Sequence, residues 1–259
     1  MASILRLVLR PWDRGGSGDD PGPTDQPAAS VTTATTTPAP AVALSIRVDV
    51  DEDAYEDGGW SMAFADEPPD PALHRDDPDS ESLDWALVGG GVSVGSSHLR
   101  MTVVNRSGET IQIRDIVATV TDRGPPLDAS VLRTPPAGLE PILDDDFDLD
   151  GGHTARAARI AEDGTSAPAF SDEVISLVPH ESVELRLNVL TATCTCRFVF
   201  QLEAVTGATT TTFEVSDGGE PFVVTAAAAD GYGAELIDAE IACNRHDIVP
   251  VGPDAAPDC

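Results

Sequence analysis

The stretch Gly91-Val92-Ser93-Val94-Gly95 carries the pattern of a nucleophilic serine. In the G-x-S-x-G elbow of serine hydrolases, a tight turn between a strand and a helix exposes the hydroxyl, and amides help to bind the oxyanion. Residues 83–88 could supply the strand, but residues 96–104 continue as an alternating strand pattern rather than a helix. We therefore expect a glycine turn that feeds a strand, with a serine hydrolase using Ser93 as the alternative.

A second set of residues able to do chemistry is a row of carboxylates at alternate positions: Asp144, Asp146, Asp148 and Asp150. Oxygen ligands at alternate positions, followed by a glycine such as Gly151, open a calcium loop of the EF-hand type. Such a loop needs a bidentate glutamate at its twelfth position, where this chain has Ala157, so it is not an EF-hand. The aspartates are candidates for a looser Ca²⁺ site in a β-loop, and a solvated acidic edge is the alternative.

The third candidate set is made of four cysteines: Cys194, Cys196, Cys243 and Cys259. Cys194 and Cys196 occupy alternate positions at the start of a strand pattern, and we expect a direct bond between them to be strained. We favour a disulfide that joins Cys243 or Cys259 to this strand, which requires an oxidising compartment. Free thiols are the alternative, because C-x-C with two distant cysteines is poor spacing for zinc.

The remaining motifs point to no enzyme class. The five histidines form no H-x-x-H or H-E-x-x-H pair, and the sequence contains no phosphate loop and no dinucleotide fingerprint. The tripeptide Asn105-Arg106-Ser107 matches a glycosylation sequon, a pattern that is common by chance. We therefore predict no catalytic residue and no cofactor.

The charge of the chain restricts its partners. It has 45 acidic and 15 basic residues, none of them lysine, and a net charge of -30. Phosphate binding needs clusters of Lys and Arg, so we expect neither nucleic acid nor an anionic membrane surface as a partner. An unknown protein or a small ligand is expected instead, and basic surfaces or cations fit the charge.

The N-terminal part of the chain predicts a tether. Residues 1–42 are rich in Pro, Thr and Ala, which is typical of a disordered linker or stalk. Near the start, Arg6 and Arg10 interrupt the apolar residues, so neither a signal peptide of about 7–15 apolar residues nor a membrane span of about 20 is present. We expect membrane association only through an N-terminal anchor that is missing or lies upstream; an ordinary cytosolic tail is the alternative.

Alternating apolar residues predict an all-β fold. Strand patterns cover residues 43–50, 60–64, 83–88, 92–94, 98–104, 110–120, 131–133, 174–177, 182–190, 195–204, 210–215 and 222–225. Residues 182–204 look like a central hairpin, and residues 226–238 are the best helix candidate although Gly231 and Gly233 weaken it. Many short strands separated by turns indicate an antiparallel β-sandwich, immunoglobulin-like in architecture. We place it at residues 43–240, with an acidic loop at 51–82 and a C-terminal tail at 241–259.

Several segments together carry a resemblance to a family: LRMTVVNRSGETIQIRDIVATV, FDLD at 147–150, ISLVPHESVELRLNV, CTCRF at 194–198 and EPFVVTA at 220–226. The chain resembles uncharacterised proteins of high-GC Gram-positive bacteria over roughly residues 85–235. Members of that family have a membrane helix, a Pro/Thr-rich linker and a β-rich outer domain, and this chain departs from them because it lacks the helix. The resemblance implies architecture and location, and it implies no activity.

These observations lead to one expected function and two alternatives. We expect a non-enzymatic binding, sensing or scaffold domain that is extracytoplasmic and associated with the cell envelope; a cytoplasmic location is the alternative. The first alternative function is the serine hydrolase that uses Ser93. The second is a Ca²⁺-stabilised, adhesion-like module.

Overall fold

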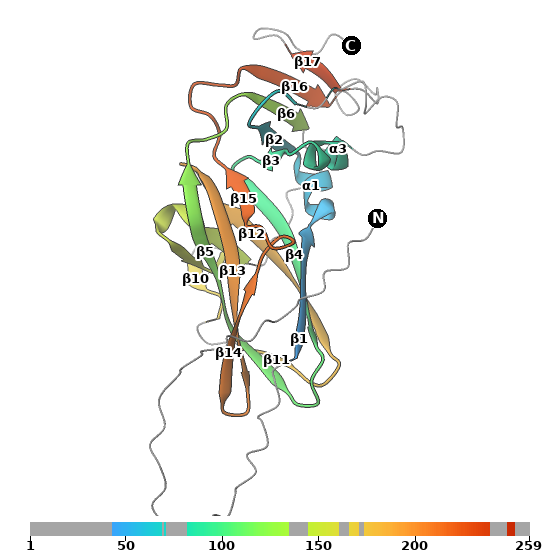
Figure 1. Cartoon of the computed structure of the whole chain (residues 1–259), viewed down its shortest axis with the longest axis vertical. Helices are drawn as coiled ribbons and strands as arrows, with labels where there is room; N and C mark the ends of the chain where they lie inside the picture. The colour runs from blue at the N-terminus through green and yellow to red at the C-terminus, as the bar shows by residue number, and fades with distance from the viewer. Residues whose placement is uncertain are drawn as a thin grey trace, which may run out of the picture. The chain divides into compact units, whose positions relative to one another are not determined.

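Three β-sheets make up the described part of the computed structural model, which comprises residues 43–68, 70, 82–134, 145–160, 166–170, 174–238 and 248–251. All of these residues belong to one unit of the chain, Val42–Cys259 (Figure 1). The fold class is therefore all-β, as the alternation of apolar residues predicts. The expected stalk at residues 1–42 lies outside the described residues.

The first sheet has the strand order β1-β4-β12-β7-β9-β10. Its strands are β1 (Leu44–Val50), β4 (Ser96–Asn105), β12 (Ser182–Leu190), β7 (Asp145–Asp148), β9 (Ala158–Ile160) and β10 (Ser166–Pro168). Neighbours are antiparallel except β12 and β7, which are parallel. Every second side chain of β4 is buried, which is the burial pattern of a strand that faces a core on one side.

The second sheet has the order β11-β5-β13-β14. Its strands are β11 (Ile175–Leu177), β5 (Ile111–Gly124), β13 (Thr195–Thr206) and β14 (Thr209–Val215), with β15 (Phe222–Thr225) paired to β13 and β8 (Thr154–Arg156) paired to β5. β13 turns into β14 at Gly207, whose φ of 58° is in the region that favours glycine. β5 and β13 are the longest strands and form the centre of this sheet.

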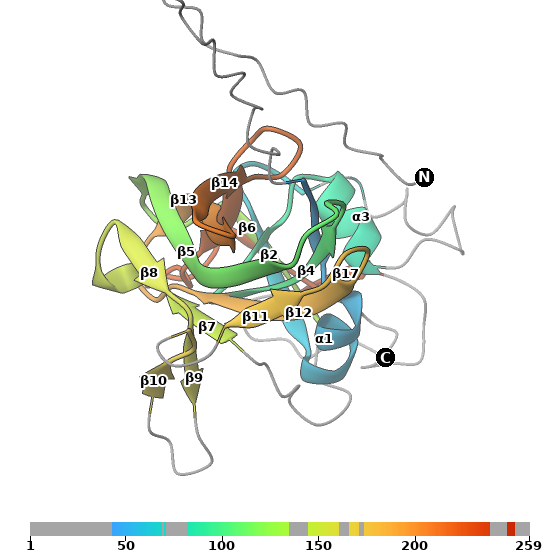
Figure 2. The same ribbon diagram turned by 90° about the horizontal axis from the view of Figure 1, so that it is seen from below.

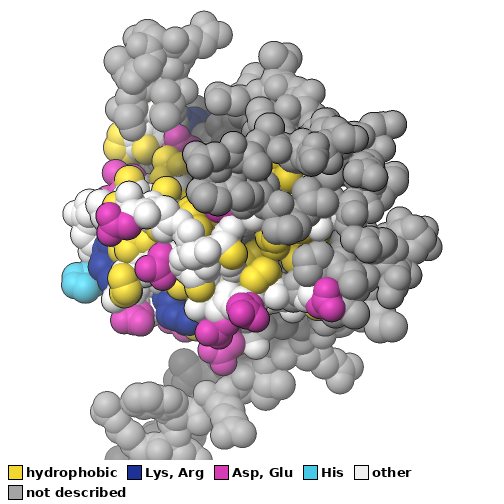
Figure 3. Space-filling model, turned by 90° about the horizontal axis from the view of Figure 1, so that it is seen from above, with side chains coloured by type: hydrophobic (Ala, Val, Ile, Leu, Met, Phe, Trp, Pro, Cys, Tyr) yellow, Lys and Arg dark blue, Asp and Glu magenta, His cyan; other side chains and the backbone are white. Residues whose placement is uncertain are grey.

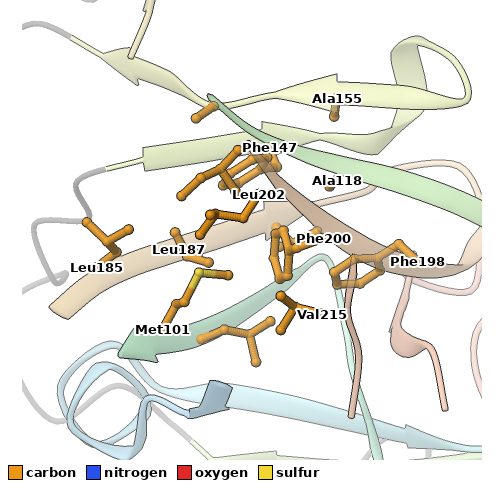
Figure 4. Close-up of a cluster of buried hydrophobic side chains, with 14 of the residues drawn as sticks. Met101, Ala118, Phe147, Ala155, Leu185, Leu187, Phe198, Phe200, Leu202 and Val215 are labelled. Carbon is orange, nitrogen blue, oxygen red and sulfur yellow. The ribbon is translucent and has the colours of Figure 1, made fainter. Parts of the chain in front are cut away.

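The two sheets lie face to face and share one apolar core (Figure 2). Phe198 and Phe200 of β13 extend into this core toward Met101 and Leu187 of the first sheet (Figure 4). The Phe200 ring lies edge-on to Phe147 at 5.4 Å between centroids, a geometry that aromatic pairs prefer. Burial of the alternating residues of β4, β5, β12 and β13 therefore holds the two layers together.

The third sheet lies at the upper end of Figure 1 and has the order β17-β16-β6-β2-β3. Its strands are β17 (Ile248–Val251), β16 (Ala234–Asp238), β6 (Ser130–Thr134), β2 (Trp60–Phe64) and β3 (Val92–Ser93). The helices α1 (Glu52–Gly58) and α3 (Ser82–Val88) contribute Tyr55 and Trp85 to a second, smaller core with Met62 and Phe64. The predicted strand at 60–64 is confirmed within the segment expected to be mostly loop.

The strand predicted at residues 83–88 is wrong, because this segment is the helix α3. A short apolar run fits a buried helical turn as well as a buried strand, so periodicity cannot separate them. Three glycines end the helix: the amide of Gly91 donates to the carbonyl of Ala86 at 2.8 Å, and Gly90 has a φ of 81°. A Cβ at Gly91 would lie 2.8 Å from the same carbonyl oxygen, so the close approach requires glycine.

The helix expected at residues 226–238 is also wrong. Residues 234–238 form β16, which pairs parallel with β6, and residues 226–233 have no regular structure. Glycine is the physical reason, because Gly231 has a φ of 85° and a Cβ at Gly233 would lie 2.8 Å from the carbonyl oxygen of Ala129. Part of the expected C-terminal tail, residues 248–251, adds the edge strand β17 beside β16.

The expected hairpin over residues 182–204 is replaced by a crossover between sheets. β12 pairs with β4 and β7 in the first sheet, whereas β13 pairs with β5, β14 and β15 in the second. Residues 191–194 make this connection. Within the described ranges, no helix has the length and apolar character needed to cross a membrane.

The shared core predicts a graded response to truncation of its phenylalanines. We expect Phe200→Ala to lower the free energy of unfolding by about 3–5 kcal/mol, because Phe200 is fully buried between the sheets. Phe213→Ala is the matched control, because Phe213 of β14 is only partly buried against the same core and should cost less. Urea denaturation measures both losses, and equal losses would contradict the shared core described above.

Candidate functional site

A cleft of about 280 Å³ lies where the first and third sheets meet beside α1. It is lined by residues of α1, β2, β4 and β6 and of the segments that join them: Tyr55, Gly59, Trp60, Ser61, Val94, Ser96, His98 and Thr134. None of these side chains carries a carboxylate or a guanidinium. The lining therefore combines aromatic rings, hydroxyl groups and one imidazole.

Local turns set the position of these side chains. Gly59 has a φ of 68°, which allows the chain to leave α1 and enter β2 at Trp60. The amide of Val94 donates to the carbonyl of Ser61 at 2.9 Å, and Gly95, with a φ of 80°, turns the chain into β4. The glycines around Ser93 thus place Ser96 and His98 opposite β2.

His98 presents an unsatisfied nitrogen in this cleft. Its ring lies edge-on to Tyr55 at 5.0 Å between centroids, and its Nε2 is 3.3 Å from the Oγ of Ser96. Its Nδ1 is buried and has no hydrogen-bond partner among the described residues. Burial lowers the pKa of His98, and the opposing charges of Asp51 and Asp146 do not offset that effect. The imidazole is therefore neutral at neutral pH.

Thr134 provides a second unsatisfied group. Its Oγ1 is buried at the end of β6 and has no hydrogen-bond partner within the described part of the chain. Buried polar atoms in native proteins nearly always have a partner, so an unpaired one in a cleft requires an explanation. Thr134 and His98 both line the cleft, and the two unpartnered atoms are themselves buried.

Ser93 lies in this region but is buried rather than exposed. It is 6% exposed, and its Oγ is 2.8 Å from the hydroxyl of Tyr55 and 3.6 Å from the Sδ of Met62. Burial raises the pKa of Tyr55, which keeps its proton, and its oxygen also accepts from the amide of His98 at 3.1 Å. A helix precedes Ser93 and a strand follows it, which is the reverse of the order in a nucleophile elbow.

A network of ion pairs holds the N-terminus of α1 in place beside the cleft. Asp51 is 1% exposed and its carboxylate pairs with Arg100 of β4 and with Arg186 of β12. Asp53 pairs with Arg100 at 2.7 Å. Hydrogen bonds to Asp53 and Asp51 raise the pKa of Arg100 above its ordinary value. Because a buried carboxylate is costly unless it is paired, this network locks α1 onto the first sheet.

The aspartates predicted as calcium ligands are used for local hydrogen bonds. Asp146 accepts from the side chain of Asn188 at 2.9 Å, and Asp148 accepts from the amide of Asp150 at 2.9 Å. Asp144 lies outside the described residues. Within the described ranges, no three His, Cys, Asp or Glu side chains come close enough together to hold a metal ion.

Asp150 organises the loop that joins the two sheets. It accepts from the hydroxyls of Thr191 at 2.9 Å and Thr193 at 2.7 Å and from the amide of Ala192 at 2.7 Å. Partial burial alone would raise the pKa of Asp150, but the hydrogen bonds from Thr193, Ala192 and Thr191 outweigh it and lower the pKa. This carboxylate therefore clamps the crossover between β12 and β13.

Cys194 and Cys196 form a disulfide with each other. Their Cα atoms are 5.6 Å apart, within the range that disulfides require. β13 begins at Thr195, so Cys194 lies just before the strand and Cys196 lies within it. The disulfide that we favoured, from Cys243 or Cys259 to this strand, is wrong, because Cys194 and Cys196 bond to each other. Cys243 and Cys259 themselves lie outside the described residues.

No motif along the chain identifies the residue that contacts this disulfide. Arg123 of β5 is paired in register with Cys196, and its Nη1 lies 3.2 Å from the sulfur of Cys194 and 3.4 Å from that of Cys196. Arg123 lies beyond the strand predicted at residues 110–120, and Gly124 and two prolines follow it. Only the strand register brings this guanidinium to the two sulfurs.

Comparison with known proteins identifies no family. No family model and no curated protein matches the chain. Among solved structures, it is similar to a Bordetella pertussis protein named ApaA, at 9% identity and a TM-score of 0.28, over 71% of this chain and 94% of that one. It is also similar to an X-ray structure of a Northeast Structural Genomics Consortium target, at 8% identity and a TM-score of 0.29, over 70% and 86%. Likenesses this weak carry no argument about function.

The clamp by Asp150 predicts a pH-dependent contribution to stability. We expect Asp150→Ala to lower the free energy of unfolding by about 2 kcal/mol at pH 7, because three donors lose a charged acceptor. The pKa is lower in the folded than in the unfolded state, so this contribution is complete above the unfolded value of about 4. It is lost as the pH falls through the lower, folded value.

Asp128→Ala, at an exposed position, is the matched control for Asp150→Ala. Urea denaturation from pH 7 down to pH 3 measures both variants. The difference between wild type and Asp150→Ala should shrink at the acid end, and the control should differ little from wild type throughout. A difference that stays constant to pH 3 would contradict the role assigned to the carboxylate.

Proposed function

We propose that this chain is a non-enzymatic binding domain whose cleft takes a small, neutral, hydroxyl-rich molecule such as a sugar. The observation that carries the proposal is the pair of buried, unpartnered polar atoms in the cleft, Nδ1 of His98 and Oγ1 of Thr134. A hydroxyl group can donate to one atom and accept from the other, so a polyol satisfies both. The neutral lining gives no counter-charge for an anion or a cation.

The size and surface of the cleft support a ligand of this class. Its volume of about 280 Å³ lies just below the range of about 300–1,000 Å³ typical of small-molecule sites, which favours a small ligand. The indole of Trp60 provides an apolar ring against which one face of a cyclic polyol can pack. Ser61 and Ser96 also line the cleft, and their hydroxyls can form hydrogen bonds with the hydroxyl groups at the edge of such a ligand.

For location, we propose an extracytoplasmic site in the cell envelope, with the cytoplasm as the alternative. The disulfide between Cys194 and Cys196 supports this proposal, because disulfides persist mainly in oxidising compartments. The acidic surface argues against nucleic acid as a partner, and Figure 3 shows acidic side chains spread over the described part of one face. We further propose to classify the two facing sheets as an immunoglobulin-like sandwich.

Ligand titration tests the binding proposal directly. We expect saturation-transfer NMR with a panel of monosaccharides and cyclic polyols to detect binding to the full chain. Trp60→Ala and His98→Ala should weaken that binding at least tenfold, because they remove the apolar ring and the free nitrogen. His153→Ala, at an exposed position away from the cleft lining, is the matched control and should bind as wild type does. Equal binding by the two histidine variants would overturn the proposal.

The non-enzymatic part of the proposal has its own test at Ser93. We expect a fluorophosphonate probe to leave Ser93 unlabelled, because its hydroxyl is buried against Tyr55 and Met62. Peptide mass spectrometry locates any adduct, and Ser93→Ala gives the background. Labelling that is present in wild type and absent from Ser93→Ala would establish the serine hydrolase instead.

A further inference from the structure

The disulfide between Cys194 and Cys196 has surroundings that a purely structural bond does not need. It lies where the crossover from β12 enters β13, and its two sulfurs face the guanidinium of Arg123. The other nitrogen of Arg123, Nη2, donates to the carbonyls of Leu149 and Gly152. These carbonyls hold the guanidinium in place against the sulfurs.

The hydroxyl of Thr191 also lies beside the same sulfurs, but its one hydrogen is donated to the carboxylate of Asp150. The hydroxyl oxygen of Thr191 is 3.5 Å from the sulfur of Cys194 and 3.9 Å from that of Cys196. A disulfide sulfur is a weak, uncharged acceptor, whereas a thiolate is an anion that a neighbouring cation stabilises strongly. The guanidinium of Arg123 is therefore arranged for the reduced form more than for the bonded form.

The position of the bond in the chain supports the same conclusion. Cross-links stabilise a fold mainly by closing loops in the unfolded chain, and the effect grows with the length of the loop. Here the ring encloses Thr195 alone, so the bond contributes little of this stabilisation. The β5–β13 pairing and the Asp150 clamp already hold the segment.

We infer that Cys194 and Cys196 form a thiol–disulfide exchange site that accepts two electrons from a dithiol and releases a thiolate beside Arg123. This inference does not depend on the ligand of the cleft. Its substrate class is a dithiol, either a small molecule or a pair of cysteines in another protein.

The exchange proceeds in two balanced steps. A thiolate of the reductant attacks the sulfur of Cys194, which forms a mixed disulfide and releases Cys196 as a thiolate. The second thiol of the reductant, as its thiolate, then attacks the mixed disulfide, so the reductant leaves as a disulfide and Cys194 is freed. Two electrons pass from the dithiol to the protein, and the dithiol releases two protons when its thiols ionise; Cys194 takes up one proton from the solvent and Cys196 stays a thiolate.

Burial decides which sulfur is attacked. Cys194 is 7% exposed and follows the exposed residues Ala192 and Thr193, whereas Cys196 is fully buried. An incoming thiolate therefore reaches Cys194, and Cys196 is the leaving group. The leaving thiolate forms within reach of Arg123 Nη1.

The test uses the full chain with Cys243→Ser and Cys259→Ser, so that Cys194 and Cys196 are the only cysteines that can be reduced and alkylated. We expect native protein to be reduced by dithiothreitol without denaturant, as detected by alkylation and mass spectrometry. The reduced protein should then react with iodoacetamide at pH 7 about tenfold faster than the same protein carrying Arg123→Gln, because loss of the cation lowers the thiolate fraction. Arg123→Lys, which keeps the charge, should restore part of that rate.

The pH profile of alkylation separates this role from a structural one. In wild type the profile should have its midpoint below that of a free cysteine, and Arg123→Gln should move it upward while the circular dichroism spectrum stays the same. A bond that resists dithiothreitol until denaturant is added would overturn the inference. The inference would also be overturned if the pH profile of alkylation of the protein with native Arg123 had its midpoint at or above that of free cysteine. This measurement does not depend on whether the Arg123 variants fold.

Discussion

The two facing sheets depend on one constraint, which is that β13 must bury every second side chain against β4 and β12. Phe198, Phe200 and Leu202 are fully buried in this interface, and the strand register with β5 follows from their positions. A shift by one residue would turn these side chains to the opposite face and expose them. The register shifts by one residue between Arg197 and Phe198, and beyond this irregularity Cys196 lies opposite Arg123.

The cleft depends on a different interaction, the pairing of buried Asp51 with Arg100 and Arg186. An unpaired carboxylate in this place would be strongly unfavourable, so α1 can begin only where both guanidiniums reach it. That position sets Tyr55 against His98 and covers one side of the cleft. The ion pairs of Asp51 thus help to set the position of α1, in addition to the apolar packing of the helix.

Local alternation was sufficient to predict most strands of the two facing sheets, because each of these strands buries one face against the core. The strands β12 and β15 have the predicted bounds, and β1 begins one residue later than predicted. The predictions were wrong where the backbone geometry of glycine, or the choice of neighbouring strand in a sheet, decides the structure. The glycines after Val88 cap a helix, and the four-residue link before Thr195 crosses between sheets instead of closing a hairpin. Neither property is present in the pattern of apolar residues.

The candidate sites were harder to predict, since their residues meet only in three dimensions. Ser93 and the aspartates stood out because they form motifs along the chain, yet the structure uses them for burial and for local hydrogen bonds. His98 and Thr134 form no motif, and they matter because the fold leaves their polar atoms without partners. Unsatisfied hydrogen-bonding capacity in a cleft, rather than sequence spacing, is therefore the physical signal on which our proposal of a ligand is based.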